Sequence, residues 1–239
     1  MKKIWKSELN ELVEVLGIKS KPVAVTFTND EIKVGTRKHV WICNALKRAA
    51  RGRSLVIDKD NSLCPGGNWH CGLTPPPPED TFRGLQWFLT RGEKLTHSIV
   101  SFHRMMALTA PPPTGLSERI LIGPVGEAEL RPDVVVFLVN AEQACRLVAL
   151  DHYWDGIPLE IEVTGSLCMA AIAYPVVTGR SNATFGDWTA RRMQKYAADV
   201  VFVSVPYERI HNLAAAVPEC SAGSAKLEIP EEIRRSLEG

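Results

Sequence analysis

The sequence predicts an α/β protein that forms a single domain over residues 1–239. Three observations predict this class. Short apolar runs alternate with stretches of helical periodicity along most of the chain. A length of 239 residues is enough for a substantial core. The content of 45% hydrophobic and 23% charged residues is ordinary for a globular protein. The alternation favours a mostly parallel or mixed sheet with helices on its faces.

The first part of the chain is predicted to contain two helices and two strands. From Leu9 to Leu16 the apolar residues recur at helical spacing, and Gly17 ends this helix. A second helix ends at Gly52, since glycine is a frequent residue just after a helix. This second helix is expected at 44–51, and the two strands are expected at 22–28 and 54–57.

Two proline runs, 75–78 and 111–113, bracket the middle of the chain. Proline runs adopt stiff extended conformations and cannot continue a helix. Residues 79–110 between them carry their own helical spacing, which predicts a helical insertion or lid over a site. Three aromatic residues are expected either to line this lid or to pack in the core: Trp69, Trp87 and Phe88.

The second part of the chain is more regular. The uninterrupted apolar run from Val134 to Val139 predicts a strand that is buried on both faces. Asn140 is a good N-cap residue for the helix expected at 141–153. The other elements expected here are strands at 120–125, 159–163 and 200–205, and helices at 167–174, 207–216 and 230–237.

Charge and hydropathy argue against nucleic-acid and membrane partners. The formal net charge is +1, so the chain has no strong positive field for a polyanion. It has no apolar run of about 18 residues, the length that a membrane span needs. Its basic start, residues 1–6, is not followed by the apolar stretch of a signal peptide. We therefore expect a cytoplasmic protein with a small-molecule partner, and we leave a homodimer open.

Six cysteines in a reducing cytoplasm do not fit a disulfide framework, which leaves core residues, redox thiols or metal ligands. Cys43 precedes the helix expected at 44–51. Cys64 lies in a segment too rich in turn residues for regular structure, and Cys71 and Cys168 lie near glycines. Free backbone N–H groups at such places stabilise thiolates and hydrogen-bond the sulfurs of iron–sulfur clusters.

The alternative for every cysteine is packing as a small hydrophobic residue in the core. Cys145 is expected to pack in this way, because it shares a predicted helix with Ala141, Leu147 and Val148. Cys220 is expected to be exposed and without a role. A C-x2-C pair, the strongest sequence pattern for zinc, is absent from the sequence.

Five short segments follow one another in a recognisable order between residues 20 and 215. They are residues 43–49 with Gly52, residues 64–67, residues 131–136 with 142–144, Gly165 with Cys168, and residues 205–208. Together they resemble the DUF169 family. The resemblance implies a bacterial or archaeal cytoplasmic protein, often from an anaerobe, in a family without a settled activity.

The resemblance implies that Cys43, Cys64 and Cys168 are recurrent cysteines of the family. It also implies a further cysteine followed by Gly-x-Arg, but the corresponding segment here, residues 185–192, has no cysteine. This departure leaves open whether Cys71 is a fourth ligand. It also leaves open whether Arg191 or Arg192 takes the part of the family's arginine.

We expect these cysteines to hold a [4Fe-4S] cluster, with Cys43, Cys64 and Cys168 as ligands and Cys71 as the undecided fourth. Three ligands would leave one iron open for lyase or hydrolase chemistry on a small polar molecule, whereas four would suit electron transfer. Zinc is the competing metal. The competing function is a non-catalytic module that holds zinc or haem, or an electron-transfer partner.

Polar residues near the cysteines are candidates for catalysis and binding. His70 adjoins Cys71 and is a candidate ligand or proton donor. Arg191 and Arg192 are candidates to clamp a carboxylate or phosphate, with a solvated helix face as the alternative. The sequence has no glycine-rich nucleotide-binding motif. The turn expected to cradle a cofactor or anion consists of Gly66, Gly67 and Asn68.

Overall fold

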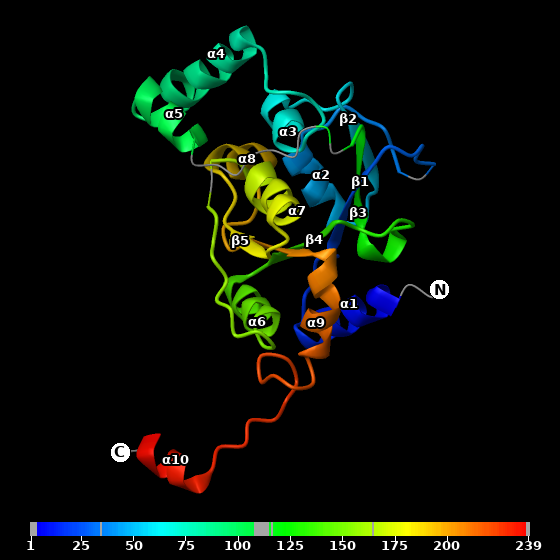
Figure 1. Cartoon of the computed structure of the whole chain (residues 1–239), viewed down its shortest axis with the longest axis vertical. Coiled ribbons are helices and arrows are strands. Elements are labelled where there is room, and N and C mark those ends of the chain that lie inside the picture. Colours follow the sequence, from blue (N-terminus) through cyan, green and yellow to red (C-terminus); the bar gives the residue numbers. More distant parts are fainter. Residues whose placement is uncertain (1–3, 34, 108–114, 116, 164, 238–239) are drawn as a thin grey trace.

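The computed structural model describes residues 4–33, 35–107, 115, 117–163 and 165–237. Its centre is a sheet in which the strands follow the order β2-β3-β1-β4-β6-β5. The strands are β1 (Val23–Thr28), β2 (Leu55–Asp58), β3 (Arg119–Pro124), β4 (Val134–Val139), β5 (Asn182–Thr184) and β6 (Val201–Pro206). Figure 1 shows helices on both sides of this sheet, so the predicted α/β class is confirmed.

The neighbouring strands in the described sheet all pair antiparallel. Val25 lies opposite Ile122 in the pair β1–β3, and Val136 lies opposite Ser204 in the pair β4–β6. The sequence pattern predicted a sheet that is mostly parallel or mixed. Most strands that are consecutive in the chain are not neighbours in the sheet. An alternation of strands and helices therefore does not fix the direction of pairing.

Alternate side chains of the strands point to opposite faces of the sheet and pack in two hydrophobic cores. Ala24, Val135 and Phe137 point to one face, where helices α1, α6 and α9 pack. Val25 and Val136 point to the other face, where α2 and the helix containing Cys168 pack. The helices of the first face are α1 (Ile4–Val15), α6 (Ala141–Asp151) and α9 (Tyr207–Ala215). Those of the second are α2 (Ile42–Ala49), α3 (Pro65–His70), η3 (Met169–Ala173), α7 (Tyr174–Thr178) and α8 (Trp188–Gln194).

A π-helical stretch, η3, begins directly after Cys168 and continues into α7. A π-turn shifts backbone carbonyls out of the regular ladder, and such turns are frequent at functional sites. Asn182 of β5 is completely buried, and its side-chain Nδ2 donates to the carbonyl of Ala170 at 2.8 Å. This hydrogen bond links the π-turn, which follows Cys168 in the chain, to strand β5 at the edge of the sheet.

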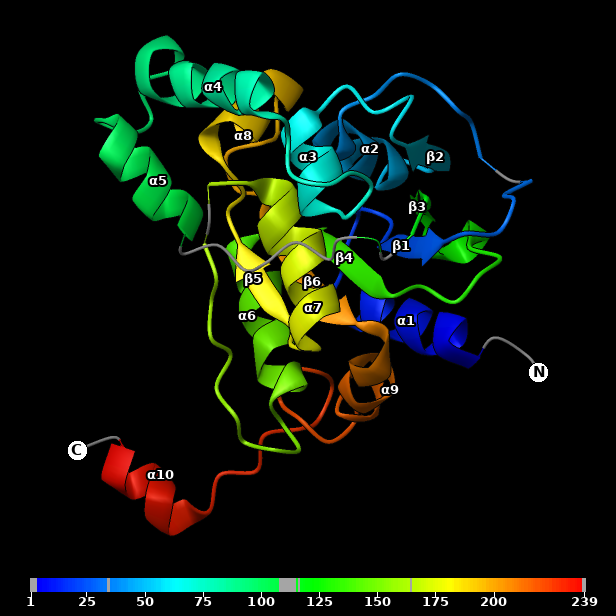
Figure 2. The same cartoon turned by 45° about the horizontal axis from the view of Figure 1, so that its top comes forward.

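The middle segment forms the predicted helical insertion, with α4 (Glu79–Trp87), η1 (Phe88–Gly92) and α5 (Ile99–Ala107). These helices lie together at one end of the molecule, away from most of the sheet (Figures 1 and 2). Residues 108–110 lie outside the described residues. That the insertion moves as a lid stays a prediction.

Most of the predicted elements are found, and two predictions were wrong. Residues 159–163 form no strand. Their main chain bonds instead to a side chain, since the N–H and C=O groups of Glu162 pair with the amide of Asn182. The turn-rich segment after Cys64 is in fact helix α3, because Pro65 is preorganised for the first helical position and the Cys64 sulfur caps the helix.

The prediction that Cys145 packs in the core was also wrong, because its side chain is exposed. Helix α6 buries the face that holds Ala144, Leu147 and Leu150, and Cys145 lies beside that face. The expected cap of this helix is confirmed, since Asn140 and Gln143 form a reciprocal capping box. The remaining described elements are η2 (Val125–Glu127) and α10 (Glu231–Leu237). Among the described helices, none combines the length and apolar character needed to cross a bilayer.

Candidate functional site

The four cysteines singled out by the sequence lie on one side of the sheet. Cys43 stands in the first turn of α2, and Cys64 and Cys71 flank the short helix α3 as its N-cap and C-cap. Cys168 directly precedes η3. Cys43, Cys71 and Cys168 are at most 8% exposed and belong to the same packed core, while Cys64 is partly exposed.

These thiols interact with one another. The thiols of Cys71 and Cys168 share a hydrogen bond, and Cys168 also interacts electrostatically with Cys43 and with Cys64. Cys43 and Cys64 interact in turn. Three separate parts of the chain thus contribute sulfur atoms to one neighbourhood. We call Cys43, Cys64, Cys71 and Cys168 the four-cysteine site.

Burial favours the protonated thiols of Cys43, Cys64 and Cys168. Removal from water raises the pKa of Cys43 far above its ordinary value, and neighbouring Cys168 and Cys64 raise it further. Burial, with Cys168, raises the pKa of Cys64 to about 12. The hydrogen bond with Cys71 and then burial raise the pKa of Cys168. Several thiolates cannot coexist here without a positive charge between them.

Backbone N–H groups nevertheless point at two of the sulfurs. The N–H of Gly67 donates to Cys64 Sγ at 3.1 Å, and the N–H of Asn44 hydrogen-bonds Cys43. A Cβ atom at position 67 would lie 3.1 Å from Cys64 Sγ and 3.3 Å from the side chain of Ile42. Gly67 therefore permits the close approach of helix α3 to this sulfur.

The four-cysteine site is not arranged around a single ion. Within the described part of the chain, no three or more His, Cys, Asp or Glu side chains are placed to hold one metal ion. A tetrahedral zinc site with Zn–S bonds of about 2.3 Å needs sulfurs roughly 3.8 Å apart. In an iron–sulfur cluster each thiolate binds a different iron, so the sulfurs lie farther apart.

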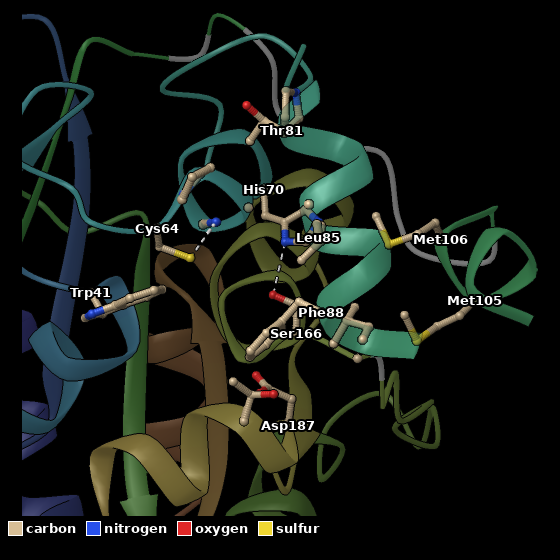
Figure 3. Close-up of a pocket in the computed structure, with 18 residues that line it drawn as sticks. Trp41, Cys64, His70, Thr81, Leu85, Phe88, Met105, Met106, Ser166 and Asp187 are labelled. Carbon is tan, nitrogen blue, oxygen red and sulfur yellow. Dashed lines mark hydrogen bonds between the residues drawn. The ribbon is translucent and has the colours of Figure 1, made fainter. Parts of the chain in front are cut away.

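A cavity of about 350 Å³ opens beside Cys64 (Figure 3). One wall comes from α3 and the segments around Ser166 and Asp187, and the opposite wall comes from the helical insertion. Most of the lining is apolar. It consists of Trp41, Cys64, Pro65, Gly66, Gly67, His70, Pro77, Thr81, Gly84, Leu85, Phe88, Leu89, Met105, Met106, Gly165, Ser166, Asp187 and Thr189.

Of the three aromatic residues expected to line a lid, Phe88 lines the cavity. Trp87 points away, with 63% of its surface exposed. Trp69 is half-buried beside the ring of His70, with the ring centroids 5.0 Å apart. The insertion thus contributes one of these three rings to the cavity.

His70, a predicted catalytic residue, lines the cavity in a buried and neutral state. Its Nδ1 lies 3.0 Å from Ser166 Oγ, as the dashed line in Figure 3 marks. Its Nε2 is buried and has no hydrogen-bond partner among the described residues. Burial lowers the pKa of His70 to about 4, so the imidazole carries no charge near pH 7.

The two predicted catalytic arginines have other contacts. The Arg191 guanidinium donates to backbone carbonyls of the loop around it, at Phe185, Ala197, Ala198 and Val200. Arg192 pairs with the buried carboxylate of Glu93 at the end of η1, and Thr189 also donates to that carboxylate. Arg191 therefore holds a loop, and Arg192 fastens the insertion to α8. Neither lines the cavity.

The predicted cofactor-binding turn is the start of α3. Gly66 and Gly67 line the cavity, whereas Asn68 is buried behind it. The side-chain Oδ1 of Asn68 finds no partner among the described residues. With six residues, α3 is too short to present an anion site at its N-terminus.

Asp187 is a site residue that the sequence analysis did not single out. Its carboxylate accepts the N–H of Leu167 at 2.7 Å and the N–H of Ala190 at 2.6 Å. It thereby joins the start of the Cys168 helix to α8. Burial raises the pKa of Asp187. Its position before Trp188, at the start of an amphipathic stretch, matches an N-cap pattern and could have revealed it.

Comparisons with known proteins support the resemblance seen in the sequence. The model of the DUF169 family, described as uncharacterised ArCR, matches residues 11–216. An uncharacterized protein of Methanocaldococcus jannaschii is 26% identical over 183 residues, which cover 73% of this chain and 75% of that protein. No solved structure gives a significant match.

Proposed function

The chain belongs to the DUF169 family, and from its own residues we propose that it is an iron–sulfur-dependent redox enzyme. Cys43, Cys64, Cys71 and Cys168 would hold the cluster. A small molecule with a polar reacting group would occupy the cavity beside Cys64. The observation that carries the proposal is the meeting of four interacting thiols next to a cavity of ligand size.

The thiols suit such a group electrostatically. Without a positive charge burial keeps the thiols of Cys43 and Cys64 protonated, and cluster iron would supply that charge. The N–H groups of Gly67 and Asn44 would hydrogen-bond the cysteine sulfurs, which is a known way to tune a cluster. When bound, a cluster of this kind supplies one-electron redox chemistry. The proposal places the chain in a reducing compartment such as the cytoplasm.

The position of Cys71 favours redox chemistry over the open-iron alternative. Its thiol hydrogen-bonds Cys168, so four ligands are available. A cluster with four protein ligands is coordinatively full and suits electron transfer. If Cys71 did not bind, one iron would stay open for lyase or hydrolase chemistry. Zinc is the alternative metal, and the iron and zinc contents of the purified protein distinguish the two.

Anaerobic reconstitution with iron and sulfide tests the proposal. We expect a brown protein with a broad charge-transfer band that bleaches on reduction. Serine substitutions of Cys43, Cys64 and Cys168, made singly, should abolish or strongly reduce this band. Cys71→Ser distinguishes the two classes of chemistry. If the variant keeps the band, three cysteines hold the cluster and one iron is open, whereas loss of the band means that Cys71 is a ligand.

Two other cysteines provide matched controls. Cys145 is exposed on α6, and Cys220 packs at the edge of the core on the opposite face of the sheet. Cys145→Ser and Cys220→Ser should keep the full chromophore. A colourless wild-type protein that contains about one zinc and no iron would overturn the proposal in favour of a structural zinc module.

A further inference from the structure

The lining of the cavity limits the charge of what it can bind. No Lys or Arg side chain among the described residues lines it. Arg191 and Arg192, the nearest candidates from the sequence, make other contacts. The ionisable lining residue that bears negative charge is Asp187, whose two oxygens already accept backbone N–H groups. An anionic ligand would meet this carboxylate and buried thiols without a compensating cation.

The apolar side chains that line the cavity indicate that most of the ligand is apolar. Leu85 and Phe88 of the insertion lie across from Trp41, and Met105 and Met106 of α5 extend the same apolar wall (Figure 3). Leu89 of the insertion also lines the cavity. Leucine, methionine and aromatic side chains favour an aromatic or branched aliphatic group. A volume of about 350 Å³ suits one small molecule.

His70 sets the polar end of the ligand. Its buried Nε2 is left without a partner among the described residues, which costs free energy unless a ligand supplies a hydrogen bond. Ser166 occupies the other ring nitrogen at 3.0 Å. Depending on the tautomer, Nε2 is either a donor or an acceptor. A hydroxyl group can serve both, because it donates and accepts.

We propose that the cavity binds an uncharged, largely apolar small molecule whose hydroxyl group hydrogen-bonds His70 Nε2 beside Cys64. This names the substrate class of the proposed redox enzyme, and it rests on that proposed function for the claim that the bound molecule reacts. The binding claim itself stands on the cavity and His70. It also refines the small polar molecule expected from the sequence.

Three probes of similar size separate the properties that matter. Phenol carries a neutral hydroxyl group, toluene lacks a hydrogen-bonding group, and benzoate is an anion. Binding to the full-length protein can be measured by titration calorimetry and ligand-observed NMR. We expect phenol to bind about 5-fold more tightly than toluene, the value of one ordinary hydrogen bond. Benzoate should bind at least about 10-fold more weakly than phenol, since it lacks a cationic partner.

Variants test the role of His70 and the location of the probes. His70→Ala should remove the preference for phenol over toluene but keep the binding of toluene. His39→Ala, a change of an exposed loop histidine, is the matched control and should keep the preference. Leu85→Trp should fill the cavity and weaken all binding, with a thermal melt to verify folding.

Three results would overturn the inference. They are benzoate binding as tight as phenol binding, an unchanged phenol preference in His70→Ala, and no binding of any probe. The iron–sulfur proposal can be contradicted independently of the proposed ligand class. A colourless protein that still prefers phenol would contradict the iron–sulfur proposal but support this ligand class. A brown protein that prefers benzoate would contradict the ligand class but support the iron–sulfur proposal.

Discussion

The two walls of the cavity differ in how they are held. The wall with the four-cysteine site belongs to the core of the sheet, and Cys71 and Cys168 are at most 5% exposed. The opposite wall belongs to the insertion, where α4 buries no side chain and α5 buries Phe102. The positions of the sulfurs are thus set by core packing. Access to them depends on a segment with few buried contacts.

Core truncations should produce the largest difference between the walls. Leu46 is fully buried in α2, on the same helix as Cys43, so Leu46→Ala should lower the global free energy of unfolding by about 2–5 kcal/mol. Phe102→Ala removes a comparable buried side chain, but its effect should be confined to the insertion. Denaturant unfolding measures the first effect, and hydrogen exchange of α4 and α5 measures the second.

The comparison of the walls would fail if Phe102→Ala lowered the global stability as much as Leu46→Ala does. That result would mean that the insertion and the sheet unfold as a single cooperative unit.

Acidification should act on the cysteine wall through His70. The pKa of His70 falls from 6.5 to about 4 on folding, so between these values the unfolded state binds a proton that the folded state does not. Stability is therefore unaffected above about pH 6.5 and is lost as the pH falls towards 4. The loss should reach about 2 kcal/mol at pH 5.

His70→Asn is the control for this pH dependence, since asparagine does not titrate. The variant should lose less stability than the wild type between pH 7 and pH 5 in thermal unfolding. Equal losses would show that His70 is not held neutral by burial.

A smaller effect is expected at the contact that fastens the insertion. Glu93→Gln replaces the carboxylate that pairs with Arg192 and Thr189 by a neutral amide. We expect opening of the insertion to become easier by about 1 kcal/mol, seen as roughly 5-fold faster hydrogen exchange in α5. Exchange in β4 should not change.

Glu79→Gln is the matched control, because it breaks an exposed ion pair with Arg83 on the same insertion. Exposed pairs of this kind contribute little. If both variants accelerated exchange equally, Glu93 would have no special role in holding the insertion.

Local patterns in the sequence predicted the parts of the fold that depend on local interactions. The capping residue Asn140 and the buried strand Val134–Val139 are both found as expected. The direction of strand pairing was not predictable, because it depends on which strands become neighbours. Strand β5 was not predicted, because it is only three residues long and lies in a polar segment, where it pairs with β6.

The candidate site was predictable in its residue types but not in its geometry. Their places near helix starts and glycines singled out Cys43, Cys64 and Cys168, and the structure brings Cys71 to them. Cys43 and Cys168 are nevertheless buried in the core, which the sequence had kept as the alternative. Arg191 could not be placed from the sequence, because its backbone partners are set by the loop that follows it. The exposure of Cys145 shows that one helix position decides whether a cysteine is buried.

The iron content of anaerobically reconstituted protein tests the central claim most directly. We expect about four irons and four sulfides per chain, as in a [4Fe-4S] cluster, with a paramagnetic signal after reduction. This content should persist in Cys145→Ser and be lost in Cys168→Ser. A wild-type protein that takes up no iron, or a Cys168→Ser variant that takes up as much as the wild type, would contradict it.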